Sequence, residues 1–216
     1  MDHRYRHWLA TATAAGLVLG WLVAAPATAP SAVMYSDAPP EGRTGAPGEG
    51  NCSSCHGALN DGQATLTLTG IPASYIPGTK YTVTFSLARA GKARWGFELT
   101  SLFTAGSTMA GTLEATSNTT QILTKAARFY VSHLSGSGAD GTFSGTANGP
   151  VSWTFDWTAP AAGGGAVAFY VAGLACDNDG QDSAGDLTYT TSFTYAEGAT
   201  TAITPTTWGW IKANYR

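Results

Sequence analysis

Apolar and polar residues alternate along most of the chain after residue 62. The clearest runs are YTVTFSL, RWGFELTSL, VSWTFDWT, VAFYVAG and TYTTSFTY. Successive side chains of a strand point to opposite faces of a sheet, so this alternation predicts half-buried β-strands. Gly, Pro, Asn or Asp clusters separate nearly all of the runs, as turns between strands require. The expected strands lie around residues 66–68, 81–87, 95–99, 129–131, 151–157, 167–171 and 189–195.

Seven to nine short strands with one apolar face need a second layer to cover that face. The sequence therefore predicts an all-β fold, an antiparallel β-sandwich of immunoglobulin-like architecture, with a small barrel as the alternative. No stretch has a helical period of useful length, apart from a last turn around residues 208–215. We find no long internal repeat.

The N-terminus departs from this pattern. A short basic segment with Arg4 and Arg6 precedes an uncharged, mostly apolar run over residues 8–25 and the small-residue stretch APATAPSA. This order predicts a secretory signal cleaved after Ala27 or Ala32. An uncleaved membrane anchor is the alternative, and it would be the chain's only link to a membrane. In both cases the rest of the chain lies outside the cytoplasm, in the periplasm or at the cell surface.

Four segments follow from these patterns. The signal is expected over residues 1–27, with cleavage as late as 32, and a Pro/Gly-rich arm over residues 28–62. The β-sandwich is expected over 63–197 and a C-terminal tail over 198–216. The 216 residues carry only 12% charged side chains and a net charge of −3, which excludes the basic surface of a nucleic-acid-binding protein. Three cysteines are too few for a disulfide framework.

The arm contains the pentapeptide CSSCH, which places Cys52, Cys55 and His56 within five residues. In covalent haem c attachment, each cysteine sulfur adds to one vinyl group of the haem, and the following histidine becomes an axial ligand of the iron. Attachment takes place after export, so the signal and the motif support each other. The sequence therefore predicts an irregular N-terminal segment that binds haem c covalently.

Three other interpretations of the motif remain open. Cys52 and Cys55 could form a redox-active disulfide, although the βαβ context of thioredoxin-like motifs is missing. They could begin a zinc site that Cys176 and His133 complete, although a second close pair of ligands is absent. They could also form a structural disulfide in a loop, with His56 incidental.

An axial histidine leaves the sixth coordination position of the iron to be filled. His3 and His7 belong to the signal, so His133 is the other histidine of the mature chain. It lies in RFYVSH, in phase with apolar residues of the same expected strand, and its side chain should leave the same face as theirs. Met109 in the GSTMAGT loop is the alternative distal ligand, followed by Met34 in the arm or an open site.

The segment DNDGQDSAGD lies between two expected strands and carries Asp177, Asp179, Asp182 and Asp186. Alternating carboxylates can converge on calcium, but the order does not fit an EF-hand loop. A solvated turn is the competing interpretation. Cys176 just before it has no partner if haem takes the other two cysteines; a small buried apolar residue or an intermolecular disulfide would account for it.

Several of these segments together resemble the choice-of-anchor V family of exported bacterial proteins. The resemblance runs from about Thr44 to Ser192 and rests on TGAPGEGNCSSCHG, YIPGTKYTVTFSL, RWGFELTSL, WTFDWTAP and AVAFYVAGLACDNDGQDSAGDLTYTTS. It implies a Reeler-like (Reelin N-terminal-domain-like) sandwich with the C-x-x-C-H motif at its N-terminal edge, and a histidine that corresponds to His133. Cys176 departs from the family, which usually has a small or amide residue there, and the C-terminus lacks an obvious sorting tail.

These observations predict an exported monohaem c-type cytochrome-like protein with His56 and His133 as axial ligands. Its function would be electron transfer outside the cytoplasm to a redox partner protein or a neighbouring cytochrome. The alternative is a cell-surface interaction or adhesion module in which the haem is mainly structural. We do not expect an enzyme, because a haem peroxidase needs a distal acid-base residue and nothing beyond His133 offers one. The sequence contains no Ser-His-Asp motif, P-loop or dinucleotide fingerprint.

Overall fold

The structure is a computed structural model that describes residues 35–136, 138–182 and 184–199. The expected signal, Met34 and the C-terminal tail with its turn around residues 208–215 lie outside the described residues. Within them, no helix is long and apolar enough to span a membrane.

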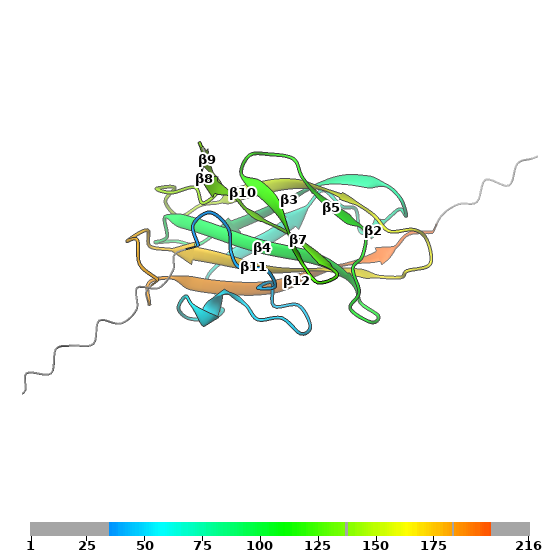
Figure 1. Cartoon of the computed structure of the whole chain (residues 1–216), viewed down its shortest axis with the longest axis horizontal. Helices are drawn as coiled ribbons and strands as arrows, with labels where there is room; N and C mark the ends of the chain where they lie inside the picture. Colours follow the sequence, from blue (N-terminus) through cyan, green and yellow to red (C-terminus); the bar gives the residue numbers. More distant parts are fainter. Residues whose placement is uncertain (1–34, 137, 183, 200–216) are drawn as a thin grey trace, which may run out of the picture. The chain divides into compact units, whose positions relative to one another are not determined.

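Two sheets form the β-sandwich (Figure 1). The four-stranded sheet has the order β1 (Thr65–Thr69), β3 (Lys80–Ala88), β10 (Val151–Thr158) and β5 (Thr112–Ala115). The six-stranded sheet has the order β2 (Ser74–Tyr75), β12 (Leu187–Glu197), β11 (Val167–Cys176), β4 (Arg94–Phe103), β7 (Arg128–His133) and β6 (Thr120–Lys125). All neighbouring strands are antiparallel except the short pair β2 and β12. A separate ribbon pairs β8 (Ser135–Gly136) with β9 (Ala139–Asp140), and one 3₁₀ turn, η1, spans Cys52–Ser54.

Aromatic side chains from both sheets fill the space between them. Trp153 of β10 lies 4.6 Å from Phe97 of β4, measured between ring centroids. Trp157 of β10 lies 4.9 Å from Phe169 of β11 in an edge-to-face arrangement. The indole N–H groups of Trp153 and Trp157 donate to backbone carbonyls, so these large side chains are buried without an unpaired donor. The apolar residues of the alternating sequence pattern therefore face the core between the two sheets.

The expected strands are all present, and the all-β sandwich predicted from the alternation is confirmed. The sequence pattern missed β2, β5 and β6, which are short or lie at sheet edges, and the two-residue strands β8 and β9. Their segments, such as TLEA and TQILTK, bury few side chains and so carry no clear alternation. In β3 and β10, the central strands of the four-stranded sheet, burial alternates as the sequence pattern predicts. In β4 and β11, the central strands of the six-stranded sheet, nearly every residue is buried, so both faces are covered.

The arm is irregular, as expected, but it is bound to the outer side of the six-stranded sheet. Glu98 of β4 points away from the aromatic core, since its neighbours Phe97 and Leu99 belong to that core. Its carboxylate accepts hydrogen bonds from the backbone N–H of Gly42 at 3.1 Å and of Arg43 at 2.6 Å. In Figure 1 the blue part of the arm crosses this side of β4 and β11.

A second carboxylate fixes the turn that precedes the cysteine motif. Glu49 accepts hydrogen bonds from Arg128 and Tyr130 of β7 and from the hydroxyl of Thr44 at 2.6 Å. Thr44 itself is buried, and its backbone pairs with Asn51 in an isolated bridge. The segment leading into CSSCH is therefore held in place by residues of the sandwich.

Burial raises the pKa of Glu98 to about 7 from an ordinary value of 4.5, and the two backbone N–H bonds only partly offset this effect. The folded state then binds the proton more tightly than the unfolded state. The contribution of Glu98 to the free energy of unfolding is complete below about pH 4.5 and is lost as the pH rises through about 7. We expect the difference between wild type and Glu98→Gln to show this slope in urea unfolding curves recorded from pH 4 to 8.

The difference between the two proteins is the useful quantity, because buried His133 contributes a slope of opposite sign in both. Glu114→Gln is the matched control, since Glu114 is an exposed partner of Lys80. Parallel curves for wild type and Glu98→Gln would contradict the prediction.

Candidate functional site

The CSSCH motif forms a compact turn. The side chain of Asn51 accepts from the backbone N–H of Ser53 at 2.9 Å and caps η1. The carbonyl of Cys52 then accepts from the N–H groups of Cys55 and His56. The turn packs against β11 and β12. The hydrogen bonds within the turn thus set its conformation, and the contacts with β11 and β12 set its position on the sheet.

Both motif cysteines are free thiols in the structure. Cys55 is exposed and Cys52 is partly buried. Burial, followed by the nearby charge of Glu98, raises the pKa of Cys52 to about 12. A redox-active C-x-x-C pair needs a thiol with a lowered pKa, so the structure disfavours that interpretation of the motif.

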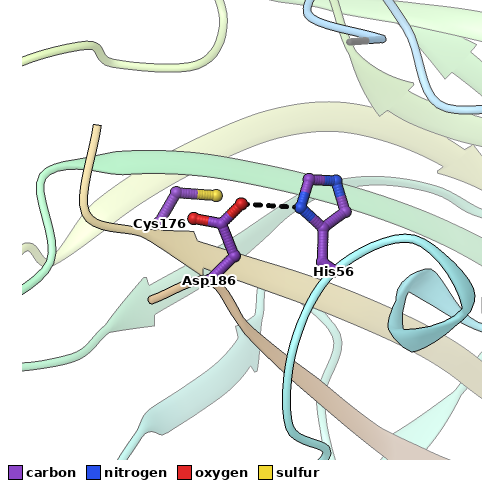
Figure 2. A group of neighbouring side chains, drawn as sticks. All are labelled: His56, Cys176 and Asp186. Carbon is purple, nitrogen blue, oxygen red and sulfur yellow. Dashed lines mark hydrogen bonds and ion pairs between the residues drawn. The ribbon is translucent and has the colours of Figure 1, made fainter. Parts of the chain in front are cut away.

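His56 is hydrogen-bonded to a carboxylate on a distant part of the chain. Its Nδ1 lies 2.7 Å from Oδ2 of Asp186, which directly precedes β12 (Figure 2). Burial raises the pKa of Asp186, but hydrogen bonds from His56 and Cys176 outweigh burial and leave that pKa below its ordinary value. With Nδ1 engaged, the Nε2 atom is the nitrogen of His56 left to bind a metal.

Two cavities adjoin the motif. The larger has a volume of about 320 Å³ and the smaller about 50 Å³. Both are bordered by Cys55 and His56 on the arm and by Gly96, His133 and Leu174 on the sheet. Cys52 borders the smaller one and Asp186 the larger. The motif and His133, about 80 positions apart in sequence, therefore face the same space.

His133 is only 6% exposed, and burial lowers its pKa to about 4, so it is neutral at physiological pH. Its Nδ1 lies 3.1 Å from the backbone nitrogen and 3.3 Å from the carbonyl oxygen of Phe97. Tyr35 borders the same two cavities as His133. Because Phe97 offers both a donor and an acceptor to the same nitrogen, either neutral tautomer of His133 can be held there.

The direction of the His133 side chain differs from the prediction. Val131 points into the aromatic core, whereas Phe129 is 46% exposed and the ring of His133 contacts the outer position Gly96. The ladder between β4 and β7 covers only two residue pairs, of which Glu98 with Ser132 is the last before His133. His133 ends β7, where it pairs with Thr120 of the edge strand β6 but has no partner on β4, and its ring lies over Gly96 instead of entering the core.

Gly96 makes room for this arrangement. A Cβ atom at position 96 would lie 3.0 Å from Cε1 and 3.2 Å from Nδ1 of His133. Gly96 does not adopt a positive φ, so glycine is needed here for space rather than for backbone conformation. The sequence offered one signal for this role: a glycine in the middle of a strand often marks a close approach.

Charged groups surround the cavities unevenly. Arg94 borders the larger cavity and Arg43 the smaller. Asp179 and Asp182 of the acidic loop line the larger cavity on another side. Lys92 holds the end of this loop through a hydrogen bond from its ammonium group to the carbonyl of Gly185.

The acidic residues proposed for calcium are used locally in part. Asp177 accepts from the backbone N–H of Asp179, and Asp179 accepts from that of Gln181 at 2.8 Å, as in Asx turns. Asp186 is turned inward to His56 instead. Calcium binding by Asp177, Asp179 and Asp182 stays a prediction.

Two further candidate ligands are placed by the structure. Met109 packs at the edge of the core, where its sulfur accepts a hydrogen bond from Thr100, and it does not border either described cavity. Cys176 ends β11 and is buried, and burial raises the pKa of its thiol. Its sulfur, Asp186 and His56 offer ligand atoms that lie within 4.8 Å of one another. The zinc interpretation expected a different set of residues.

No protein-family profile matches the sequence, and no characterised protein matches it as a relative. Solved structures with a similar backbone include the human F-spondin reeler domain (21% identity, TM-score 0.43), which covers 66% of this chain and 92% of that one. The Reelin-N domain of F-spondin (22%, TM-score 0.42) covers 67% and 90%. A cohesin from Acetivibrio cellulolyticus in complex with a dockerin (13%, TM-score 0.35) covers 58% and 96%. These likenesses concern the β-sandwich, and the choice-of-anchor V resemblance stays a prediction.

The packing of His133 against Gly96 can be tested by a double-mutant cycle. We expect Gly96→Ala to lower the free energy of unfolding by about 1–3 kcal/mol, because the added methyl group crowds the His133 ring. In a His133→Ala background the same change should cost much less, since the ring is gone. Urea unfolding of the four proteins measures the coupling. An equal cost in both backgrounds would show that the methyl group meets something other than His133.

Proposed function

We propose that this protein binds haem c covalently through Cys52 and Cys55, with His56 and His133 as axial ligands, and transfers electrons outside the cytoplasm. The observation that carries the proposal is the meeting of the CSSCH motif and His133 at the same cavities. From the sequence, His133 was one of several candidate distal ligands, beside Met109, Met34 and an open site. The fold supports it by bringing a buried, neutral imidazole to the space beside the motif.

The residues present fit a haem group in chemical type. Free thiols stand at the rim for the two thioether bonds. His56 presents one ring nitrogen while the other is bound to Asp186. Gly96 and Leu174 supply an apolar wall, and Arg43 and Arg94 supply cations that suit the two propionates. When bound, the haem supplies one-electron redox chemistry, which no side chain of this site provides.

The residues of the chain set the conditions for that chemistry. His133 can serve as a ligand if its Nδ1–H donates to the carbonyl of Phe97, which lies 3.3 Å away. The buried wall formed by the sheet limits water on one side, and the acidic loop borders the cavity on another. A redox partner protein or a neighbouring cytochrome would accept or supply the electron.

The test is expression of the full chain together with a haem-attachment system. We expect intact-mass analysis to find one added haem. We expect the absorption spectrum of the reduced protein to be that of a six-coordinate, low-spin haem iron. His133→Ala should keep the added mass but give a five-coordinate, high-spin spectrum, because the ligand is lost and the thioether bonds are not. Met109→Leu is the matched control and should leave the spectrum unchanged. A secreted chain without added haem would refute the proposal.

The second candidate is a surface interaction module in which the haem mainly fixes the arm. The names of the similar structures favour this class, since one of them is a cohesin in complex with a dockerin. Against a structural role for the haem, Glu98 and Glu49 already bind the arm to the sheet. The two candidates therefore differ in what haem removal does.

We expect Cys52→Ala with Cys55→Ala to change the free energy of unfolding by no more than about 1 kcal/mol relative to the haem-free wild type. The reason is that the hydrogen bonds by which Glu98 and Glu49 join the arm to the sheet do not involve the two sulfur atoms. Urea unfolding of both haem-free proteins, followed by tryptophan fluorescence, measures the change. If the holoprotein is also no more than modestly stabilised, the haem serves redox chemistry. Loss of folding without haem would favour the interaction module instead.

A further inference from the structure

The structure points to Asp186 as a positioning residue that orients His56 and lowers the reduction potential of the iron. This inference rests on the proposed haem ligation. In the sequence, Asp186 was recognisable only as one of four acidic residues in a loop, and nothing linked it to His56.

The contact between the two residues has the geometry of a charge-assisted hydrogen bond. Nδ1 of His56 lies 2.7 Å from Oδ2 of Asp186, and the carboxylate is only 2% exposed. A proton on Nδ1 leaves Nε2 with its lone pair, which is the nitrogen that the motif directs to iron. Figure 2 shows the carboxylate aimed at the imidazole ring.

Backbone pairing fixes both residues in this relation. Just after the motif, Leu59 forms a parallel bridge with Thr188, two residues past Asp186. The N–H of Thr188 donates to the carbonyl of Ala58 at 2.9 Å, and the N–H of Asn60 donates to the carbonyl of Thr188 at 2.8 Å. His56 and Asp186 thus lie on two segments that are hydrogen-bonded a few residues away, so the contact is not a chance meeting of flexible side chains.

The carboxylate has no competing cation among the described ion pairs. Its other oxygen, Oδ1, makes no hydrogen bond of standard geometry. The Cys176 thiol and the backbone of Asp177 lie near the carboxylate and help to lower its pKa, but less than His56 does. Cys176 is a buried, neutral thiol and therefore a weak donor. His56 is therefore the main partner of the negatively charged Asp186 carboxylate.

A carboxylate that accepts the second N–H of a ligating histidine makes the imidazole more electron-donating. A stronger donor stabilises the oxidised iron more than the reduced iron, which lowers the reduction potential. A merely structural ion pair between the arm and β12 would hold the motif in place without this effect on the potential.

The experiment compares holoprotein of wild type, Asp186→Asn and Asp179→Asn by redox titration. Asparagine at 186 keeps an oxygen that can accept the Nδ1–H but removes the charge. Asp179→Asn is matched because it removes one charge from the lining of the same cavity without touching His56. We expect a clearly more positive potential in Asp186→Asn and a much smaller shift in Asp179→Asn.

A second measurement needs only the wild-type holoprotein. With histidine labelled by nitrogen-15, the Nδ1-bound proton of His56 should be visible by NMR and exchange slowly with solvent, because it is bonded to the buried carboxylate of Asp186. Rapid exchange of that proton would contradict the inference even if Asp186→Asn does not fold.

The outcomes separate the two proposals. Haem attachment in all three proteins with equal shifts for Asp186→Asn and Asp179→Asn would overturn the inference and leave the proposed function standing. One equivalent of zinc in the purified holoprotein would also overturn it, because a metal at His56, Cys176 and Asp186 would take Nδ1 from the carboxylate. Absence of haem from the wild type would remove the proposed function and the inference together.

Discussion

Glu98 is the residue on which the placement of the arm depends. It projects from the central strand β4 to the outer face of the six-stranded sheet, where it is fully buried by the arm that it binds. A buried carboxylate that loses its partners costs several kcal/mol, whereas here two backbone N–H groups satisfy it. The irregular segment around CSSCH is therefore docked by the sheet rather than by its own secondary structure.

That docking brings three parts of the chain to one place. The motif comes from the arm, His133 from the end of β7, and Asp186 from the start of β12. The sandwich core lies on the other side of the sheet and supports the wall of the cavity through Trp95 and Phe97, which flank Gly96. The candidate site therefore lies on the outer face of the six-stranded sheet, while the inner face packs against the other sheet. The polar residues of the outer face are not needed for the core and are available to contact a ligand.

Much of this molecule was predictable because the signals are local. The two-residue alternation of YTVTFSL or VSWTFDWT depends only on which side of a strand is covered, so it revealed the sandwich. CSSCH is likewise a local pattern, because its two cysteines and its histidine lie within five residues. His133 was predicted as a candidate because few other histidines exist, but the predicted face of its side chain was wrong, since His133 has no partner on β4 and its ring lies over Gly96.

The strands and the CSSCH motif could be predicted from the sequence, because each depends on a pattern of a few neighbouring residues. The contact between His56 and Asp186, the contact between Gly96 and His133, and the binding of the arm by Glu98 could not be predicted, because each joins residues 37 to 130 positions apart. Such contacts exist only once strand pairing and sheet packing have set the distances. The sequence around a glycine in a strand or an aspartate in a loop does not show which distant residue it will contact in the folded protein.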